Sequence, residues 1–145
     1  MADMSPEEWA FWDTWMRAQR LLMRELDRGL QRDCGISKAE FSVLVTLRGP
    51  MRVGELADAL GWDKSRVSHL LTRMEKRGLT ARSEDGAGGR RTGIELTAEG
   101  RRLAESATRA HGANIRRSVL DALTPEQAAA IRSWSEELIE RVEPA

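Results

Sequence analysis

Residues 55–68 read ELADALGWDKSRVS. The apolar residues of this run, together with Val53 before it, recur at i, i+3, i+4 and i+7, which is the spacing of one helix face. We expect a short helix over residues 53–60 that ends at Gly61. A tight turn then leads into a second helix, for which Asp63 is a suitable N-cap. Helix, short glycine-containing turn and second helix together predict a helix-turn-helix.

The second helix, predicted over residues 64–77, has two faces of different composition. Its apolar stripe is Val67, Leu70, Leu71 and Met74. Its other face is rich in hydrogen-bond donors, namely Lys64, Ser65, Arg66, Ser68, His69, Thr72, Arg73 and Lys76. Small hydroxyls tolerate close approach to a major groove, and Arg can pair with O6 and N7 of guanine. We predict that these eight residues contact DNA. Four of them lie toward the N-terminal half of the helix, which reaches bases, namely Ser65, Arg66, Ser68 and His69. Arg73 and Lys76 are expected on phosphates.

A β-hairpin is expected directly after this helix. Residues 79–83 read as a short extended segment, and Ile94-Glu95-Leu96 alternates apolar and polar as a half-exposed strand does. The polar, glycine-rich loop between them carries Arg90 and Arg91. A flexible tip with arginines suits a narrow, electronegative minor groove. The hairpin over residues 80–96 is therefore predicted to be a wing, which makes residues 37–97 a winged helix-turn-helix lobe.

The placement of charge supports contact with nucleic acid. The 145 residues carry 23 Lys and Arg against 23 Asp and Glu, so the net charge of zero excludes a protein that coats nucleic acid with bulk charge. Residues 64–91 nevertheless carry eight basic and three acidic residues, a net of +5. Residues 118–145 carry two and six, a net of −4, and residues 1–30 carry four and six, a net of −2. Positive charge is concentrated on the second helix of the predicted helix-turn-helix and on the predicted wing, as phosphate contact requires.

Long amphipathic helices are expected at both ends of the chain. The patterns SPEE, SKAE and TPEQ, which begin at Ser5, Ser37 and Thr124, are capping boxes and predict helix starts near residues 6, 38 and 125. The first helix carries an apolar surface wider than one small core face accepts. Few Pro and Gly and many Ala, Leu, Arg and Glu agree with a mainly α-helical protein.

Several classes of function find no support in the sequence. A single cysteine, Cys34, excludes an intramolecular disulfide and fits a reducing cytosol. We expect a cytoplasmic protein, because neither a signal peptide nor an apolar stretch of about 18 residues is present. No glycine motif of a nucleotide-binding enzyme occurs, so neither catalysis nor a cofactor is predicted. His69 and His111 lie on different elements, so no metal site is predicted.

Three runs resemble the MarR family of bacterial transcriptional regulators. They are residues 55–68, residues 71–79, and residues 94–100, which match that family's VxLTxxG pattern. The resemblance extends in order over essentially the whole chain. It implies a single MarR-type domain, mainly α with a small β-hairpin wing, that forms a homodimer through helices in residues 6–34 and 98–143. It also implies binding to a pseudo-palindromic operator in double-stranded DNA on the bacterial nucleoid. We predict a repressor, with activation as the alternative that the sequence leaves open.

The wing departs from the family pattern at one position. The family carries Asp-x-Arg before the LT pair, and here Arg90 occupies the arginine position while Gly88 replaces the aspartate. Asp85 could substitute for that aspartate, or the tip could be looser. Arg91 could also share the role of Arg90 in the minor groove.

Alternatives remain for the tryptophans of the first helix, for Cys34 and for the class of function. Trp9, Trp12 and Trp15 could hold a small aromatic effector, as the resemblance implies for some members, or they could form core and dimer packing. Cys34 could sense oxidation as some relatives do, although their cysteine lies nearer the start of the first helix. Trp62, in the turn, is predicted to pack against the core. The rival to a DNA-binding regulator is a winged-helix module that binds protein and not DNA.

Overall fold

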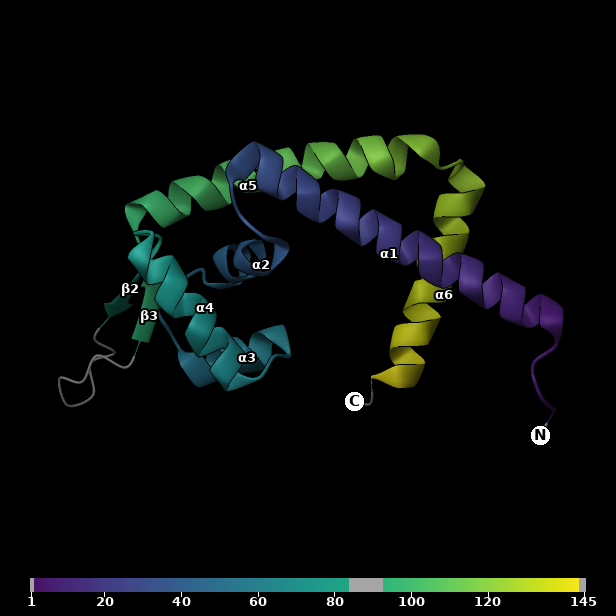
Figure 1. Ribbon diagram of the computed structural model, residues 1–145, viewed down its shortest axis with the longest axis horizontal. Helices are drawn as coiled ribbons and strands as arrows, with labels where there is room; N and C mark the ends of the chain where they lie inside the picture. The colour runs from purple at the N-terminus through teal and green to yellow at the C-terminus, as the bar shows by residue number, and fades with distance from the viewer. Residues whose placement is uncertain (1, 84–92, 144–145) are drawn as a thin grey trace. The chain divides into compact units, whose positions relative to one another are not determined.

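The computed structural model describes residues 2–83 and 93–143 and is mainly α-helical (Figure 1). The elements along the described chain are α1 (Pro6–Cys34), α2 (Lys38–Thr46), β1 (Met51–Arg52), α3 (Val53–Leu60), α4 (Lys64–Lys76), β2 (Thr80–Ser83), β3 (Gly93–Leu96), α5 (Ala98–Ser118), a 3-10 turn (Leu120–Ala122) and α6 (Pro125–Val142). The strands form an antiparallel sheet in the order β1-β3-β2. The predicted fold class, mainly α with a small β wing, is confirmed.

The chain divides into two compact units, Met1–His111 and Gly112–Ala145, and the division falls within α5. In the first unit α1 packs on α2, α2 on α3, α3 on α4, and α4 on β2. Figure 1 shows α3 and α4 side by side, with the sheet at the far end of α4. One buried cluster holds these elements together, and its centre includes Leu30, Val43, Leu56, Val67 and Met74, all fully buried.

Local signals in the sequence set the helix boundaries. All three predicted capping boxes are present, each with its Ser or Thr hydroxyl accepting from the backbone N–H three residues later. Glycines at left-handed φ end α1 at Gly35 (67°) and α3 at Gly61 (70°). Gly78 follows α4 at a φ of 75°. A side chain is disfavoured in this region, which explains why glycine stands at these stops.

Three local features differ from the sequence prediction. Strand β1 was not predicted, because two residues are too few to show an alternating pattern; Met51 pairs with Ile94 of β3. The 3-10 turn before α6 was also not predicted. Asp63 occupies the N-cap of α4 as expected, but its side chain makes no capping hydrogen bond. Nearby groups other than this carboxylate must therefore satisfy the first N–H groups of α4, or water must do so.

The LTxxG pattern anchors α5 against the end of α4. The Thr97 hydroxyl donates to the Gly78 carbonyl at 2.6 Å and accepts from the Gly100 N–H at 3.0 Å. The Thr97 N–H donates to the Leu79 carbonyl at 3.0 Å. A Cβ at Gly100 would collide with the carbonyl oxygen of Leu79, so only glycine permits this approach. The motif therefore holds the turn between α4 and β2 against the first turn of α5.

Large apolar side chains remain exposed on the long helices. In the first unit they lie along α1, where Phe11 is 72% exposed. In the second unit they lie on α6, where Ile139 is 57% and Val142 is 68% exposed. Among the described residues, no helix combines the length and the apolar content that crossing a bilayer requires.

Candidate nucleic-acid interface

Helix α4 presents the predicted DNA-contacting residues on its outer face. The eight side chains Lys64, Ser65, Arg66, Ser68, His69, Thr72, Arg73 and Lys76 are all exposed. The opposite stripe is buried against the core, as predicted, and consists of Val67, Leu70, Leu71 and Met74. Each buried Leu or Val side chain contributes roughly 1.5–3 kcal/mol by leaving water, which fixes the rotation of α4 about its axis. The donors must therefore point outward.

The hydroxyl of Thr72 is engaged within the helix. It donates to the Ser68 carbonyl at 3.0 Å, which uses its only proton. The hydroxyl lone pairs and the methyl group stay exposed to solvent. In this rotamer Thr72 can accept a hydrogen bond or contact a thymine methyl, and it does not donate to phosphate.

Arg66 is held by the aromatic ring of the turn. Its guanidinium carbon lies 4.2 Å from the centroid of Trp62, within the range of a cation–π contact. Trp62 is half-buried and packs against the core cluster, as predicted. The contact with Arg66 was not predicted. The signal available in the sequence was the spacing of four between an aromatic residue just before the helix and an arginine in its first turn.

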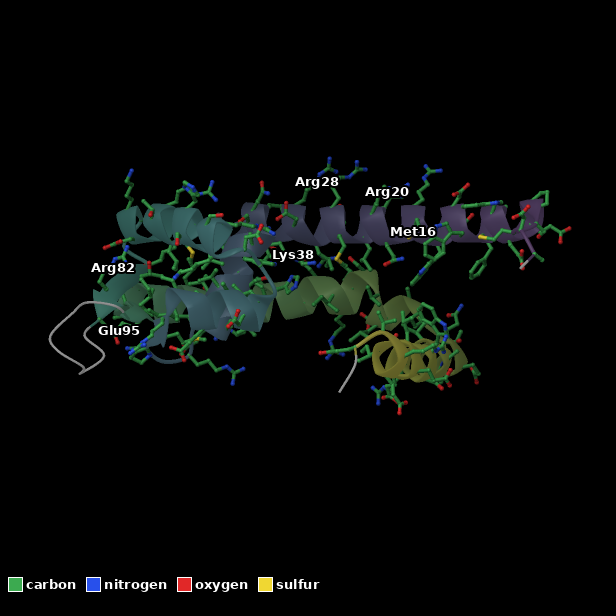
Figure 2. The ribbon with its side chains drawn as sticks, turned by 90° about the horizontal axis from the view of Figure 1, so that it is seen from below. Met16, Arg20, Arg28, Lys38, Arg82 and Glu95 are labelled. Atoms are coloured by element: carbon green, nitrogen blue, oxygen red, sulfur yellow. The ribbon has the colours of Figure 1, made fainter. Side chains whose placement is uncertain are left out.

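The far end of α4 is tied to the junction between α1 and α2. The two terminal nitrogens of Arg77, the C-cap of α4, bind different partners: Nη1 donates to the Glu40 carboxylate and Nη2 to the Gly35 carbonyl at 3.0 Å. Lys38, at the start of α2, is fixed to α1 as well, because its backbone N–H donates to Asp27 at 2.8 Å. Figure 2 shows Lys38 beside α1. Helix α4 is therefore restrained at its C-terminal end by contacts with earlier helices.

The hairpin strands pair in the register Thr80↔Leu96, Ala81↔Glu95, Arg82↔Ile94 and Ser83↔Gly93. Figure 2 shows Arg82 and Glu95 at this sheet, from neighbouring strands. A Cβ at Gly93 would meet the Ser83 hydroxyl, which would have to rotate away. Arg82 is exposed and adds a cation to this lobe. The predicted tip residues, Asp85, Gly88, Arg90 and Arg91, lie outside the described residues.

The predicted ligand residues occupy the start of α1. Trp9 and Trp12 are 52% and 45% exposed, whereas Trp15 is half-buried. A shallow hollow of about 590 Å³ lies here, and Phe11 and Trp12 are among its lining residues. A second hollow, of about 480 Å³, lies between α2 and α5.

Two titratable side chains lie near the helix junctions. Cys34 is half-buried, and burial, followed by the negative charge of Asp33, raises the pKa of its thiol. His111 stacks at a tilt on Phe41, with ring centroids 4.8 Å apart, and burial lowers its pKa. Within residues 2–83 and 93–143, no group of three or more His, Cys, Asp or Glu residues is placed to hold a metal ion.

Comparison with known proteins decides the family. Residues 36–91 match the MarR family model. Over its whole length, the chain is 31% identical to Sco3205, a MarR family transcriptional regulator from Streptomyces coelicolor solved in complex with DNA. The alignment covers 94% of that chain with a TM-score of 0.85. The chain belongs to the MarR family.

Two further relatives are transcriptional regulators. AbsC, a MarR family transcriptional regulator from Streptomyces coelicolor, is 29% identical, and the alignment covers 98% of each chain with a TM-score of 0.82. An uncharacterized HTH-type transcriptional regulator of Bacillus subtilis (strain 168), YfiV, is 23% identical over 129 residues, which are 88% of this chain and 80% of that protein. The predicted identity as a MarR-type transcriptional regulator is confirmed.

Proposed function

We propose that this MarR family regulator binds a pseudo-palindromic operator as a homodimer and represses transcription. The observation that carries the proposal is the outer face of α4, where eight exposed side chains are hydroxyl-bearing, imidazole or cationic. Helix α4 enters a major groove, and the hairpin, with Arg90 and Arg91, follows the adjacent minor groove. The relationship to Sco3205, which was solved with DNA, supports the same role. The site of action is the nucleoid, in the bacterial cytoplasm.

The homodimer is supported by the apolar surfaces that each unit leaves in solvent. On α1 these are Trp9, Phe11 and Trp12, and on α6 they include Ile131 and Ile139. Exposed apolar side chains of this size and number favour an association surface. Phe11→Glu and Ile139→Glu should each shift the protein to monomer in sedimentation. Arg28→Ala, at an exposed position on α1, is the matched control and should leave the dimer intact.

Selection of bound sequences from a random DNA pool tests the central claim. A dimer that reads two grooves should enrich two inverted half-sites whose centres are about one helical turn apart. Affinity for the enriched site should fall steeply with salt, because bound cations release counterions from phosphate. A pool without enriched sequences, together with a shallow salt slope, would favour the protein-binding winged-helix module. For repression, a reporter placed behind the enriched site should be transcribed more when the regulator is removed.

An effector that releases the DNA is part of the proposal. The hollow between α2 and α5 is one candidate binding site for such an effector. Its lining combines apolar residues, including Leu44 and Ala104, with arginines such as Arg48 and Arg101. The tryptophan site at Trp9, Trp12 and Trp15 is the other candidate. Screening small aromatic compounds for loss of operator binding tests both sites. Thr108→Trp, at an exposed residue of the lining, should abolish a response that uses the hollow between α2 and α5. Trp12→Ala should abolish a response that uses the tryptophan site.

A further inference from the structure

The turn of the helix-turn-helix holds one cation of the recognition helix in a fixed place. The Arg66 guanidinium lies over the Trp62 ring, 4.2 Å from its centroid. Trp62 packs against the buried cluster, so the ring is anchored while Arg66 is exposed. Trp62 stands just before the N-cap and Val67 four positions into α4, the arrangement of a hydrophobic staple. The core therefore determines where this guanidinium sits.

The other cations of the same face are not restrained in this way. Within the described part of the chain, Lys64, Arg73 and Lys76 have no side-chain hydrogen bond, ion pair or ring contact. Long cationic side chains lose rotamer freedom when they bind, which weakens binding unless they are held beforehand. Arg66 has already lost part of this freedom in the free protein. It also lies in the first turn of the recognition helix, where base contacts are made.

Stacking leaves the hydrogen-bonding edge of Arg66 available. The contact with Trp62 uses the flat face of the guanidinium, whereas all five N–H groups lie in its plane. A guanidinium held by one face can therefore present a parallel pair of donors to O6 and N7 of guanine. Lysine lacks this planar fork and cannot replace it.

We propose that Trp62 is a positioning residue that holds Arg66 ready to read a guanine in each half-site. This inference rests on the proposed function, since it presupposes a specific DNA site. Trp62 itself need not touch the DNA. Its ring sets the direction of the Arg66 fork, and the specificity at one base pair depends on that direction. If Trp62 only fills the core, replacing it should weaken binding to all sequences equally.

The test compares base discrimination in full-length variants. Arg66→Ala first identifies the base pair whose preference it abolishes in the selected site. Affinities are then measured for that site and for the same duplex with this G·C pair changed to A·T. Wild-type protein should discriminate by on the order of tenfold to a hundredfold, the range of one bidentate contact. Trp62→Leu should lose most of this ratio, whereas Trp62→Phe, which keeps an aromatic face, should retain it.

Three controls separate positioning from packing. In the Arg66→Ala background, Trp62→Leu should cause no further loss of affinity for the selected site, which is the signature of a coupled pair. Arg73→Ala should lower affinity for both duplexes while the ratio stays unchanged. In the free protein, NMR should show ring-current shifts of the Arg66 δ protons that disappear in Trp62→Leu. If that variant does not fold, Trp62→Met replaces it.

The outcomes distinguish this inference from the proposed function. If wild-type protein enriches no sequence, the proposed function fails and the inference fails with it. If wild-type protein enriches a site and Trp62→Leu keeps the same base ratio, the inference alone is overturned. It is also overturned if Trp62→Leu lowers the affinity for the selected site equally in the Arg66→Ala background, or if the Arg66 protons show no ring-current shift.

Discussion

The guanidinium of Arg77 donates to the carboxylate of Glu40 at 2.6 Å, and this ion pair joins the C-cap of α4 to the first turn of α2. The other carboxylate oxygen of Glu40 accepts from the Ser37 N–H at 3.0 Å, which completes the capping box of α2. One carboxylate thus has two separate roles. The Glu40 side chain is 14% exposed and that of Arg77 is 43% exposed, so solvent screens the pair only in part.

Two substitutions separate the two roles of Glu40. Glu40→Gln keeps an acceptor for the capping box, as Gln127 does in α6, but it removes the ion pair. We expect a loss of about 1 kcal/mol in the free energy of unfolding, because the pair is partly exposed. Glu40→Ala should lose about 1 kcal/mol more, the usual contribution of a cap. Urea denaturation measures both. Equal stabilities of the two variants would contradict the dual role.

The capping box of α2 and the ion pair between Glu40 and Arg77 show how far the sequence alone predicts the fold. The capping box lies within four residues, so its spacing is visible in the sequence. The partner of Arg77 lies 37 residues away, and nothing local to either residue indicates the pairing. Strand β1 is similar, because Met51 pairs with Ile94 only after the chain has folded. Helix periodicity predicted the exposed face of α4, whereas the contact between Arg66 and Trp62 depends on side-chain rotamers in the turn.

Two glycines of α5 should respond in opposite ways to alanine. At Gly100 an added Cβ would collide with the Leu79 carbonyl, so Gly100→Ala forces α5 away from the end of α4. We expect a loss of roughly 1–3 kcal/mol, as for other overpacked sites. At Gly112 nothing lies within 4 Å of the added Cβ, so Gly112→Ala should raise stability by about 0.5–1 kcal/mol. Thermal denaturation of the two variants checks the signs, and a stable Gly100→Ala protein would refute the close packing.

The stability of the fold should fall in mild acid through His111. Burial, followed by the positive charge of Lys38, lowers the pKa of His111 from its ordinary value of 6.5. Below about pH 6.5 the unfolded chain binds a proton at this site that the folded chain resists, so the free energy of unfolding decreases as pH falls. Above that pH the contribution is constant. His111→Phe removes the titration and keeps a ring against Phe41.

The measurement for His111 is urea denaturation at pH 7.5 and at pH 5.5. The difference in unfolding free energy between the two pH values should be smaller in His111→Phe than in the wild-type protein. Other groups contribute to the pH dependence of both proteins and cancel in this comparison. An identical difference in both would show that His111 does not couple folding to protonation.

Oxidation should leave DNA binding intact. The thiolate is the reactive form of cysteine, and burial together with Asp33 raises the pKa of Cys34, which keeps it protonated at neutral pH. Wild-type protein and Cys34→Ser should therefore bind the selected operator equally well before and after hydrogen peroxide, as measured by fluorescence anisotropy. Release of DNA by peroxide from the wild-type protein alone would support the redox-sensing alternative.

Alanine substitutions of Arg66 and Arg73 should weaken DNA binding in different ways, although both are exposed arginines on one helix. Arg66 lies in the first turn of α4 and Arg73 in the last. A cation on phosphate contributes equally to all sequences and releases counterions. Arg73→Ala should therefore weaken specific and nonspecific binding alike and reduce the salt slope by about one for each phosphate that is no longer neutralised. Arg66→Ala should relax the preference at one position in each half-site with a cost of about 1–3 kcal/mol. Affinities over a range of salt concentrations test both. A reversed pattern would place Arg73, and not Arg66, on the bases and would require α4 to enter the groove by its C-terminal end.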